Sequence, residues 1–304
     1  MGYTALYRKF RPLNFSEMVG QEHITRTLRN QVIEQRVGHA YLFNGGRGTG
    51  KTSAAKILAR AVNCLNPKDG EPCNECAVCK AALEGSLTDI VEMDAASNNS
   101  VEDVRAIRDE VNFLPTVAKY RVYIIDEVHM LSQSAFNALL LTLEEPPEHV
   151  IFILATTNLE SVPITIVSRC QRFEFHRITD KDIVERLKFV CDEENIKYED
   201  DGLKEIAILA DGGLRDALSI LDQLSKNEEV ITSTLVANEI GSISNKKIED
   251  LVQSLGENDI LNIEKIFDEL QSSNLNYKVF VKKVIEVLSN LGVKLLTSPE
   301  VSRL

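Results

Sequence analysis

The strongest constraint on this chain is the glycine-rich run at residues 45–52, which reads Gly-Gly-Arg-Gly-Thr-Gly-Lys-Thr. The run matches G-x-x-x-x-G-K-[ST], a loop whose backbone N–H groups surround phosphate oxygens. Such a loop follows a buried strand and opens a helix, and the apolar run at 40–43 and the helical segment after the loop supply both flanks. A glycine-rich turn formed by chance would need neither flank. The run therefore predicts a phosphate-binding loop in an α/β sheet.

Three further apolar runs, rich in β-branched residues and closed by polar turns, have the composition of buried parallel strands. Together with the first, the expected strands occupy residues 40–43, 90–93, 122–125 and 151–155. Amphipathic segments lie between them: Ser100 and Asp103 form a capping box, and residues 132–143 carry apolar side chains on one face. This alternation predicts a doubly wound parallel sheet.

The sequence divides into three expected domains. The sheet domain covers residues 1–178, after which strand patterns end, and Thr179 with Asp182 forms a capping box that opens a helix. A small helical domain follows at 179–241, and further helices at 242–304 end as if cut inside a larger protein. Apolar side chains in that last range have the spacing of packed helices, at Ile260, Ile263, Phe267 and Leu270.

Charge and hydropathy exclude several classes of protein. The net charge of −12 disfavours a stand-alone DNA reader, so any contact with nucleic acid has to be local or shared among subunits of an assembly. No stretch approaches the roughly 20 apolar residues that span a bilayer, and the basic N-terminus has no apolar segment behind it. We therefore expect a cytoplasmic protein without a membrane partner.

A second motif completes the expected nucleotide site. Lys51 is expected to bind the β- and γ-phosphates of ATP, and Thr52 is expected to bind Mg²⁺. The apolar strand before Asp126 and Glu127 ends in these two carboxylates, of which the first would hold Mg²⁺ and the second would polarise the attacking water. Such a strand end alone is often only solvated, but beside the loop it predicts hydrolysis. The polar residues 156–158, at the next strand end, would lie beside the γ-phosphate or form a simple turn.

The sequence as a whole resembles the clamp-loader ATPases of the tau/gamma family of bacterial DNA polymerase III subunits. The matching text covers about residues 3–225 and lies at 5–12, 19–23, 45–52, 126–131, 136–140, 143–147, 168–170 and 214–219. The resemblance implies an AAA+ fold: a P-loop parallel sheet with a zinc-binding insert, then a helical lid domain and a helical collar domain. Residues 243–304 resemble the collar only loosely.

The resemblance also implies roles for single residues. Thr157 falls at the sensor 1 position, Arg215 at sensor 2, and Arg169 at the arginine finger that reaches the neighbouring subunit's nucleotide. A planar, always charged guanidinium suits a phosphate whose charge shifts during transfer, although a lone arginine is more often a surface ion pair. His129 is expected to be structural. The remaining expected nucleotide contacts are Tyr7, Arg11, Pro12, Val19 and Leu214 at the adenosine, and Gly46, Gly48, Thr49, Gly50 and Ser53 at the phosphates.

Four of the six cysteines form a cluster, Cys64-x₈-Cys73-x₂-Cys76-x₂-Cys79. In a reducing cytosol this spacing indicates metal before disulfide, and four thiolates suit tetrahedral zinc. An iron–sulfur cluster is the alternative. The same insert occurs in the resembled family, where zinc is structural. Cys170 and Cys191 stand apart and are expected to pack as small apolar side chains.

The resemblance places DNA contacts at two helix starts, here residues 97–100 with Arg105 behind them, and Ser132 with Gln133. Backbone N–H groups at a helix start can bind phosphate without reading bases, although the same residues can serve only as caps. The family often has a lysine where this chain has Leu141, and a leucine cannot supply that second charged contact to the neighbour's nucleotide.

The resulting hypothesis is an ATP hydrolase that acts as a motor within the DNA polymerase III holoenzyme, a DNA-directed DNA polymerase and hence a transferase complex. Its expected partners are other clamp-loader subunits, including further copies of itself, the sliding clamp and primed DNA. A non-catalytic scaffold is one alternative, which the intact Lys51, Asp126 and Glu127 disfavour. A helicase-loading or branch-migrating relative is another, which the cysteine insert disfavours.

Overall fold

A computed structural model describes residues 3–227, 229–240, 245–271, 280–281, 284–285 and 287–289, and the statements below concern these residues. The chain forms two compact units. The first contains Met1–Ile183 and Asp211–Asp216, and the second contains Val184–Ala210 and Ala217–Leu304. The division into three domains stays a prediction. Within the described ranges, every helix is too short or too polar to cross a lipid bilayer.

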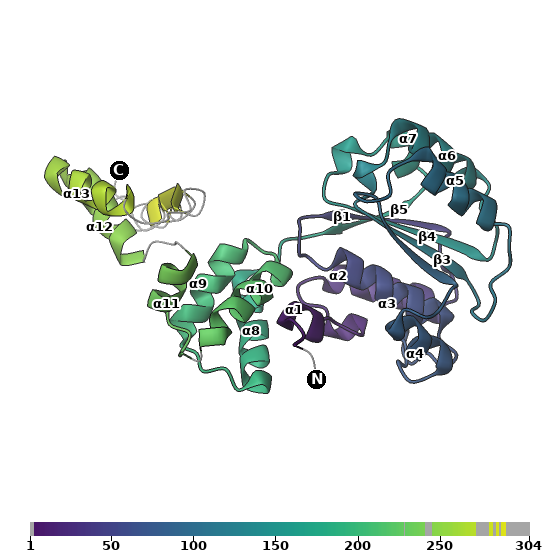
Figure 1. Cartoon of the computed structure of the whole chain (residues 1–304), viewed down its shortest axis with the longest axis horizontal. Coiled ribbons are helices and arrows are strands. Elements are labelled where there is room, and N and C mark those ends of the chain that lie inside the picture. The colour runs from purple at the N-terminus through teal and green to yellow at the C-terminus, as the bar shows by residue number, and fades with distance from the viewer. Residues whose placement is uncertain are drawn as a thin grey trace, which may run out of the picture. The chain divides into compact units, whose positions relative to one another are not determined.

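The first unit is built on a parallel five-stranded sheet with the order β2-β3-β4-β1-β5 (Figure 1). The strands are β1 (Ala40–Gly45), β2 (Ile90–Asp94), β3 (Arg121–Asp126), β4 (Val150–Thr156) and β5 (Gln171–Phe175). All four predicted strands are confirmed. Because the strands are parallel, the glycine-rich loop after β1 and the carboxylates after β3 lie at the same edge of the sheet.

The fifth strand, β5, is missing from the sequence prediction. Its residues read Gln-Arg-Phe-Glu-Phe, and only the last is fully buried. An edge strand that pairs on one side needs no continuous apolar run, so its polar alternation resembles a solvated turn. Its register with β1 shows that the two strands run side by side over the same length, because Gln171 pairs with Tyr41 and Phe175 pairs with Gly45.

Helices cover both faces of this sheet (Figure 1). On one face lie α2 (Glu22–Ile33), α3 (Lys51–Asn63) and α4 (Ala77–Glu84), and on the other lie α5 (Val101–Glu110), α6 (Gln133–Glu144) and α7 (Ile164–Val167). Alternate strand residues point to opposite layers: Tyr41 and Phe43 pack with α2 and α3, whereas Leu42 packs with α5 and α6. The N-terminal segment contributes α1 (Leu6–Lys9) and the short 3₁₀ turn Phe15–Glu17, and further 3₁₀ turns lie at Val128–Met130 and Leu159–Ser161.

The second unit is helical in its described part. Its helices are α8 (Asp180–Glu194) and α10 (Leu214–Leu224), which begin in the first unit, then α9 (Asp200–Ala210), α11 (Ser233–Ile240), α12 (Asn245–Glu257) and α13 (Ile260–Gln271), with a 3₁₀ turn at Ser225–Asn227. The start of α9 lies against the strand-like residue Ile231, because a Cβ on Gly202 would come within 2.3 Å of the Ile231 carbonyl oxygen.

The expected packing of the last helices is only partly correct. Ile263 packs against the buried cluster of α12 and α13, and the Phe267 ring meets the Phe280 ring edge-on with centroids 6.4 Å apart, but Ile260 is 66% exposed. The side chain of Leu270 lies outside the described residues. A 3.6-residue period identifies a helix but does not say how much of its apolar stripe a neighbour covers.

Candidate functional site

The glycine-rich loop joins β1 to α3 and depends on glycine at two close approaches. Gly45 has φ 150°, and a Cβ there would lie 2.3 Å from the Phe175 carbonyl oxygen of β5. Gly48 has φ 74°, and a Cβ there would lie 3.1 Å from Gly213 Cα. Side chains at these positions would push β5 and the segment before Arg215 away from the loop.

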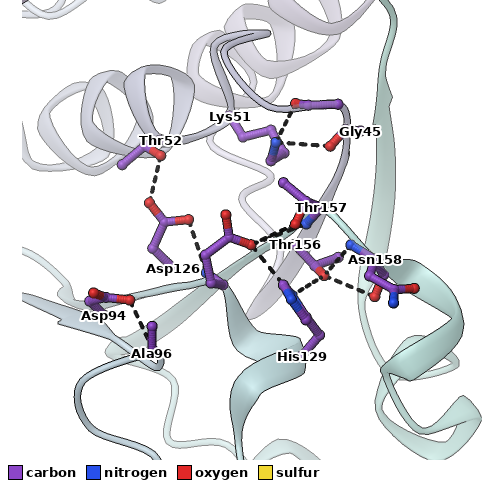
Figure 2. Close-up of polar contacts among 12 residues, drawn as sticks. Gly45, Lys51, Thr52, Asp94, Ala96, Asp126, His129, Thr156, Thr157 and Asn158 are labelled. Carbon is purple, nitrogen blue, oxygen red and sulfur yellow. Dashed lines mark hydrogen bonds and ion pairs between the residues drawn. The ribbon is translucent and has the colours of Figure 1, made fainter. Parts of the chain in front are cut away.

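Lys51 and Thr52 open α3 directly behind this loop (Figure 2). The Lys51 ammonium donates to the carbonyl oxygens of Gly45 at 2.9 Å and Gly46 at 2.6 Å. Burial lowers the pKa of Lys51, although the carboxylates of Glu127 and Asp126 act to raise it. A buried cation next to backbone N–H groups is an arrangement that attracts phosphate.

The Thr52 hydroxyl donates to an Asp126 carboxylate oxygen at 2.7 Å, which joins α3 to the end of β3 (Figure 2). A hydroxyl and a carboxylate at this separation are oxygen donors of the kind that Mg²⁺ prefers. The two residues predicted to hold magnesium are therefore in contact, and their chemistry fits that ion.

Glu127 has a left-handed backbone, with φ 48° and ψ 44°, which is uncommon for a residue with a side chain. Its carboxylate accepts the Thr157 hydroxyl at 2.9 Å and the Thr157 N–H at 3.3 Å. His129 Nδ1 lies 3.4 Å from the same carboxylate and 3.0 Å from the buried Thr156 hydroxyl (Figure 2). The ends of β3 and β4 therefore form one polar network around Glu127, and His129 is part of its support.

Two arginines from distant segments lie near the start of α3 and the loop before it. Arg11 donates to the Ser53 hydroxyl at 3.2 Å, and the Arg215 guanidinium lies over the Tyr7 ring with its carbon 5.1 Å from the ring centre. Burial lowers the pKa of Arg11, Glu92 acts to raise it, and the nearby Arg215 lowers it. The structure thus brings Tyr7, Arg11 and Arg215 to one place from opposite ends of the unit's sequence.

The other expected nucleotide contacts lie around this place without a contact that defines their role. Thr49 is buried and donates its hydroxyl to the Gly46 carbonyl oxygen at 2.8 Å. Pro12, Val19 and Leu214 are half-buried, and each adjoins a residue that packs on the loop or lies beside it. Their assignment to the adenosine pocket stays a prediction.

Gln21 is a member of this site that the sequence prediction missed. Its side chain is fully buried, donates to the His176 carbonyl oxygen at 2.7 Å and accepts the His176 N–H at 3.2 Å. It also approaches the Thr49 carbonyl oxygen at 3.4 Å. One amide therefore fastens the chain after β5 and the glycine-rich loop to the start of α2. The matched run at 19–23 contained Gln21, but a buried glutamine has no spacing signal that separates it from a surface one.

Arg169 lies at the other edge of the sheet. It precedes β5, whereas the loop follows the carboxyl end of β1, and four residue steps of the shared register separate the two edges by about 13 Å. Its guanidinium donates to Glu144 at 2.7 Å and to the Thr165 carbonyl oxygen at 2.8 Å, and its side chain is 34% exposed. The structure therefore does not bring Arg169 to the glycine-rich loop of its own chain. Leu141, on the same helix as Glu144, is 59% exposed.

The four-cysteine cluster is compact. The sulfur atoms of Cys64, Cys73, Cys76 and Cys79 lie within 4.8 Å of one another. Tetrahedral zinc with Zn–S bonds of about 2.3 Å needs sulfurs about 3.8 Å apart, so the four thiols fit such an ion. Backbone N–H groups of Cys73, Cys76 and Cys79 point to the preceding cysteine sulfurs at 3.3, 3.3 and 3.4 Å.

The acid–base properties differ within the cluster, because burial raises the pKa of Cys64 and of Cys79, whereas the Glu75 N–H lowers the pKa of Cys73. Burial acts to raise the pKa of Cys76, but N–H groups from Cys79 and Leu65 lower it to about 6, which favours the thiolate that binds metal. Burial raises the pKa of Cys170 and of Cys191 to about 12. Both remain thiols and pack among apolar side chains, as predicted.

The two segments predicted to touch DNA lie next to each other. The Ser132 N–H donates to the Asn99 carbonyl oxygen at 3.1 Å, which joins the starts of α5 and α6. Ser100 and Ser132 both cap their helices, with hydroxyls 3.2 Å from the N–H groups of Asp103 and Ala135. The hydroxyls are therefore occupied by capping, and the neighbouring amides and N–H groups are what this surface offers to a phosphate.

Comparison with known families agrees with this geometry. The family model described as "DNA polymerase III, delta subunit" matches residues 20–179, and the model described as "DNA polymerase III clamp loader subunit, ATPase lid domain" matches residues 182–224. The chain is 54% identical to DNA polymerase III subunit tau of Bacillus subtilis, over 89% of this chain and 48% of that relative.

Two further relatives give the same result. Identity is 38% to subunit tau of Escherichia coli, over 96% of this chain and 46% of the relative. It is 37% to subunit gamma of Buchnera aphidicola subsp. Baizongia pistaciae, over 96% of this chain and 80% of the relative. The chain thus spans about half the length of the two tau subunits.

Solved structures share the fold. The RuvB Holliday junction branch migration motor of Thermotoga maritima matches with a TM-score of 0.56 and 19% identity, over 81% of this chain and 79% of that one. A variant of the same RuvB protein matches with a TM-score of 0.57 and 20% identity, over the same shares of the two chains. At this identity the likeness shows the fold alone, an AAA+ parallel sheet followed by helices.

Proposed function

Because the chain belongs to the tau/gamma family of DNA polymerase III subunits, we propose that it is the ATP-hydrolysing motor subunit of a clamp loader. In this role it couples ATP binding and hydrolysis to the loading of a sliding clamp on primed DNA. The observation that carries the proposal is the assembled site at one edge of the sheet. There Lys51 lies in the glycine-rich loop, Thr52 contacts Asp126, and Glu127 is held by Thr157.

The residues divide the work of hydrolysis. The loop N–H groups and Lys51 bind the β- and γ-phosphates, and the carbonyl oxygens that now accept from Lys51 are exchanged for phosphate oxygens. Glu127 orients the attacking water and accepts its proton. Thr52 and Asp126 would hold Mg²⁺, which would neutralise part of the phosphate charge.

Thr157 links the state of the nucleotide to Glu127. Its hydroxyl and its N–H now donate to the Glu127 carboxylate, so both donors compete with water for the same oxygen. A γ-phosphate beside β4 offers Thr157 a more highly charged acceptor, which releases Glu127 toward the water. This exchange is the sensor 1 role implied for Thr157.

Arg215 and Arg169 act on different nucleotides. Arg215, beside the loop of its own chain, serves as the sensor 2 arginine and packs with Tyr7 near the adenosine, together with Arg11, Pro12, Val19 and Leu214. Arg169 lies at the opposite edge and serves as the finger for a neighbouring subunit. In the isolated chain Glu144 neutralises it, and a neighbour's phosphates replace Glu144 in the assembly.

The proposed domains follow the expected division: the nucleotide-binding domain at 1–178, the lid at 179–241 and the collar at 242–304. A lid model matches residues 182–224, within the second range.

A clamp loader needs a surface for the clamp, and the loop after α5 exposes three large apolar side chains, Phe113 (65%), Leu114 (75%) and Val117 (65%). We assign this loop to clamp contact and the adjoining starts of α5 and α6, at Asn98, Asn99 and Gln133, to the DNA backbone.

The chain is proposed to work in the cytoplasm with other clamp-loader subunits, including further copies of itself. Within the polymerase holoenzyme it contributes ATP hydrolysis, and nucleotidyl transfer, the transferase activity of that complex, belongs to other subunits. The four cysteines are proposed to bind zinc as a structural ion, because their sulfurs fit it and Cys76 favours a thiolate.

Steady-state ATP hydrolysis tests the proposal, measured with the chain alone and then with clamp-loader partners, clamp and primed DNA. The expected result is low hydrolysis alone and strong stimulation by primed DNA in the full mixture. Equal rates in every mixture, with assembly confirmed by mass photometry, would leave a nucleotide-binding scaffold and refute the motor.

A further inference from the structure

The four-cysteine insert contacts α3, where Asn74 meets Arg60, and the N-terminal segment that carries Arg11, where Glu71 meets Phe15. Both α3 and that segment contribute to the proposed nucleotide site. We propose that the insert, with its metal bound, positions residues 13–18 against α3 and thereby sets nucleotide affinity, with Glu71 as the positioning residue. This inference rests on the proposed nucleotide site, and it assigns the metal a task in ligand binding beyond holding the insert together.

Glu71 provides the main contact between the insert and that segment. Its two carboxylate oxygens accept the N–H of Phe15 at 2.7 Å and the N–H of Ser16 at 2.9 Å. Arg29 of α2 lies 3.5 Å from the same carboxylate and donates to the Asp69 carbonyl oxygen at 3.0 Å. The Glu71 side chain is only 15% exposed, so these are hydrogen bonds to a charged acceptor in a mostly buried place.

A second contact passes through the buried Arg60 of α3. Its guanidinium donates to the Leu13 carbonyl oxygen at 2.8 Å and to the Asn74 side chain at 3.3 Å. Asn74 also donates to Asn14 at 2.7 Å. Arg60 is 5% exposed, and burial lowers its pKa while Cys79 acts to raise it. One arginine therefore connects the helix of the glycine-rich loop, the N-terminal segment and the insert.

The segment in turn touches the nucleotide loop. Met18 Cε would lie 3.0 Å from a Cβ on Gly50, so the methionine packs on the loop itself. Arg11 donates to Ser53 in the first turn of α3. A shift of the segment by 1 Å would change both contacts, and positioning errors of that size weaken binding and catalysis.

The metal ligands flank the two insert residues that make these contacts. Glu71 lies two positions before Cys73, and Asn74 lies between Cys73 and Cys76 with a left-handed backbone at φ 56°. The insert also packs closely on α2, because a Cβ on Gly70 would come within 2.5 Å of the Arg29 carbonyl oxygen. Without a metal, four thiols at this spacing lose the bonds that join them, and the placement of Glu71 and Asn74 is no longer fixed.

The experiment compares the parent chain with Glu71→Gln, and with the matched control Glu75→Gln, which changes an exposed carboxylate of the same insert. Three quantities are measured for each protein: bound zinc, affinity for a fluorescent ADP with Mg²⁺, and hydrogen exchange of residues 13–18. For Glu71→Gln we expect full zinc content, faster exchange at 13–18 and about tenfold weaker nucleotide binding, since a charged hydrogen-bond acceptor is lost. Glu75→Gln should match the parent.

A second arm removes zinc from the parent with a chelator and then restores it. Removal should weaken nucleotide binding and speed exchange at 13–18, and it should add little to the effect of Glu71→Gln, because both changes break the same connection. Parental affinity and exchange in both Glu71→Gln and the metal-free parent would overturn the inference. A parent chain that binds no nucleotide would instead refute the proposed function, and exchange at 13–18 would still decide whether the insert holds the segment.

Discussion

Two arginines in the same unit lie at opposite edges of one sheet, and their surroundings differ accordingly. Arg215 packs over Tyr7 beside the glycine-rich loop, at the carboxyl edge of the strands. Arg169 precedes β5 at the amino edge and is paired with Glu144 and the Thr165 carbonyl oxygen. The parallel order of the sheet fixes this separation, since β5 starts where β1 starts.

The comparison separates the groups that one chain gathers at the glycine-rich loop from an arginine that it does not bring to them. Binding groups from β1, α3, β3 and the N-terminal segment meet at the carboxyl edge. Arg169, at the amino edge, is paired with Glu144, and under the proposed function it acts on another subunit's nucleotide. On that proposal, fast hydrolysis requires assembly.

The largest expected effect is that of Arg169→Ala. It should reduce DNA-stimulated hydrolysis by about a thousandfold, because a finger in trans contributes at least that factor, while nucleotide affinity stays at the parental value. Single-turnover hydrolysis in the assembled complex and equilibrium nucleotide binding by the isolated chain measure the two quantities. If Arg169→Ala lost nucleotide binding as well as hydrolysis, Arg169 would act on the nucleotide of its own chain. The proposed difference between Arg169 and Arg215 would then be wrong.

Glu127→Gln should reduce hydrolysis by about a hundredfold and keep nucleotide binding, because it removes the proton acceptor and leaves Lys51 in place. The fold-reduction caused by Glu127→Gln should be the same whether residue 169 is arginine or alanine, since Glu127 acts on the nucleotide of its own chain. Rates measured for the double variant with Arg169→Ala check this independence. A Glu127→Gln chain as active as the parent would exclude this residue as the base.

Substitution of Asp89 tests whether residues at the amino edge of the sheet stabilise the fold independently of Arg169. It is 1% exposed, and its carboxylate accepts the N–H groups of Thr116, Val117 and Ala118 at 2.8 to 2.9 Å. Burial acts to raise its pKa, but these N–H groups lower it below the ordinary 3.8. Asp89→Asn should lower the free energy of unfolding at pH 7 by about 2 kcal/mol.

The pH dependence of that loss follows from the direction of the shift. A carboxyl whose pKa is lower in the folded state stabilises the fold above pH 3.8, and this contribution is lost as pH falls through the folded pKa. Urea unfolding of both proteins from pH 7 to pH 3 should show the gap shrinking below pH 4. A gap that is constant or grows in acid would contradict the assignment.

Arg215→Ala should have the smallest effect, about tenfold on nucleotide affinity and a similar factor on hydrolysis, because Arg215 binds in its own site and Arg11 remains nearby. Fluorescence titration with a nucleotide analogue measures the affinity. Arg36→Ala, with an 83% exposed side chain, is the control for loss of one positive charge. An effect on hydrolysis alone would mean that Arg215 behaves like Arg169.

The sequence predicted the strands and the chemistry of the carboxyl edge because those features are local. The residue pattern at 45–52 alone indicates a phosphate-binding loop, and the four buried strands differ from their surroundings in composition. β5 was missed because an edge strand with polar residues has no such contrast. Gln21 was missed because its partners, His176 and Thr49, are distant in sequence.

Contacts between distant segments needed coordinates for the same reason. The pairing of Glu127 with Thr157, and of Arg169 with Glu144, joins elements that the sheet order brings together. The sequence motifs suggested a role for each residue but did not indicate which side chain it contacts in the folded chain. The connection from Glu71 to Phe15 and Ser16 is of the same kind, and it links the cysteine insert to the nucleotide site.

The most direct test of action in trans mixes two inactive variants, Arg169→Ala and Lys51→Ala, in one assembly with partner subunits, clamp and primed DNA. The Arg169→Ala chain binds nucleotide but lacks the arginine finger. The Lys51→Ala chain keeps Arg169 but does not bind nucleotide. We predict that hydrolysis returns in the mixture, because Arg169 of the Lys51→Ala chain reaches the nucleotide of its neighbour. Hydrolysis as low as that of either variant alone, with both shown by mass spectrometry in the same complex, would contradict the account.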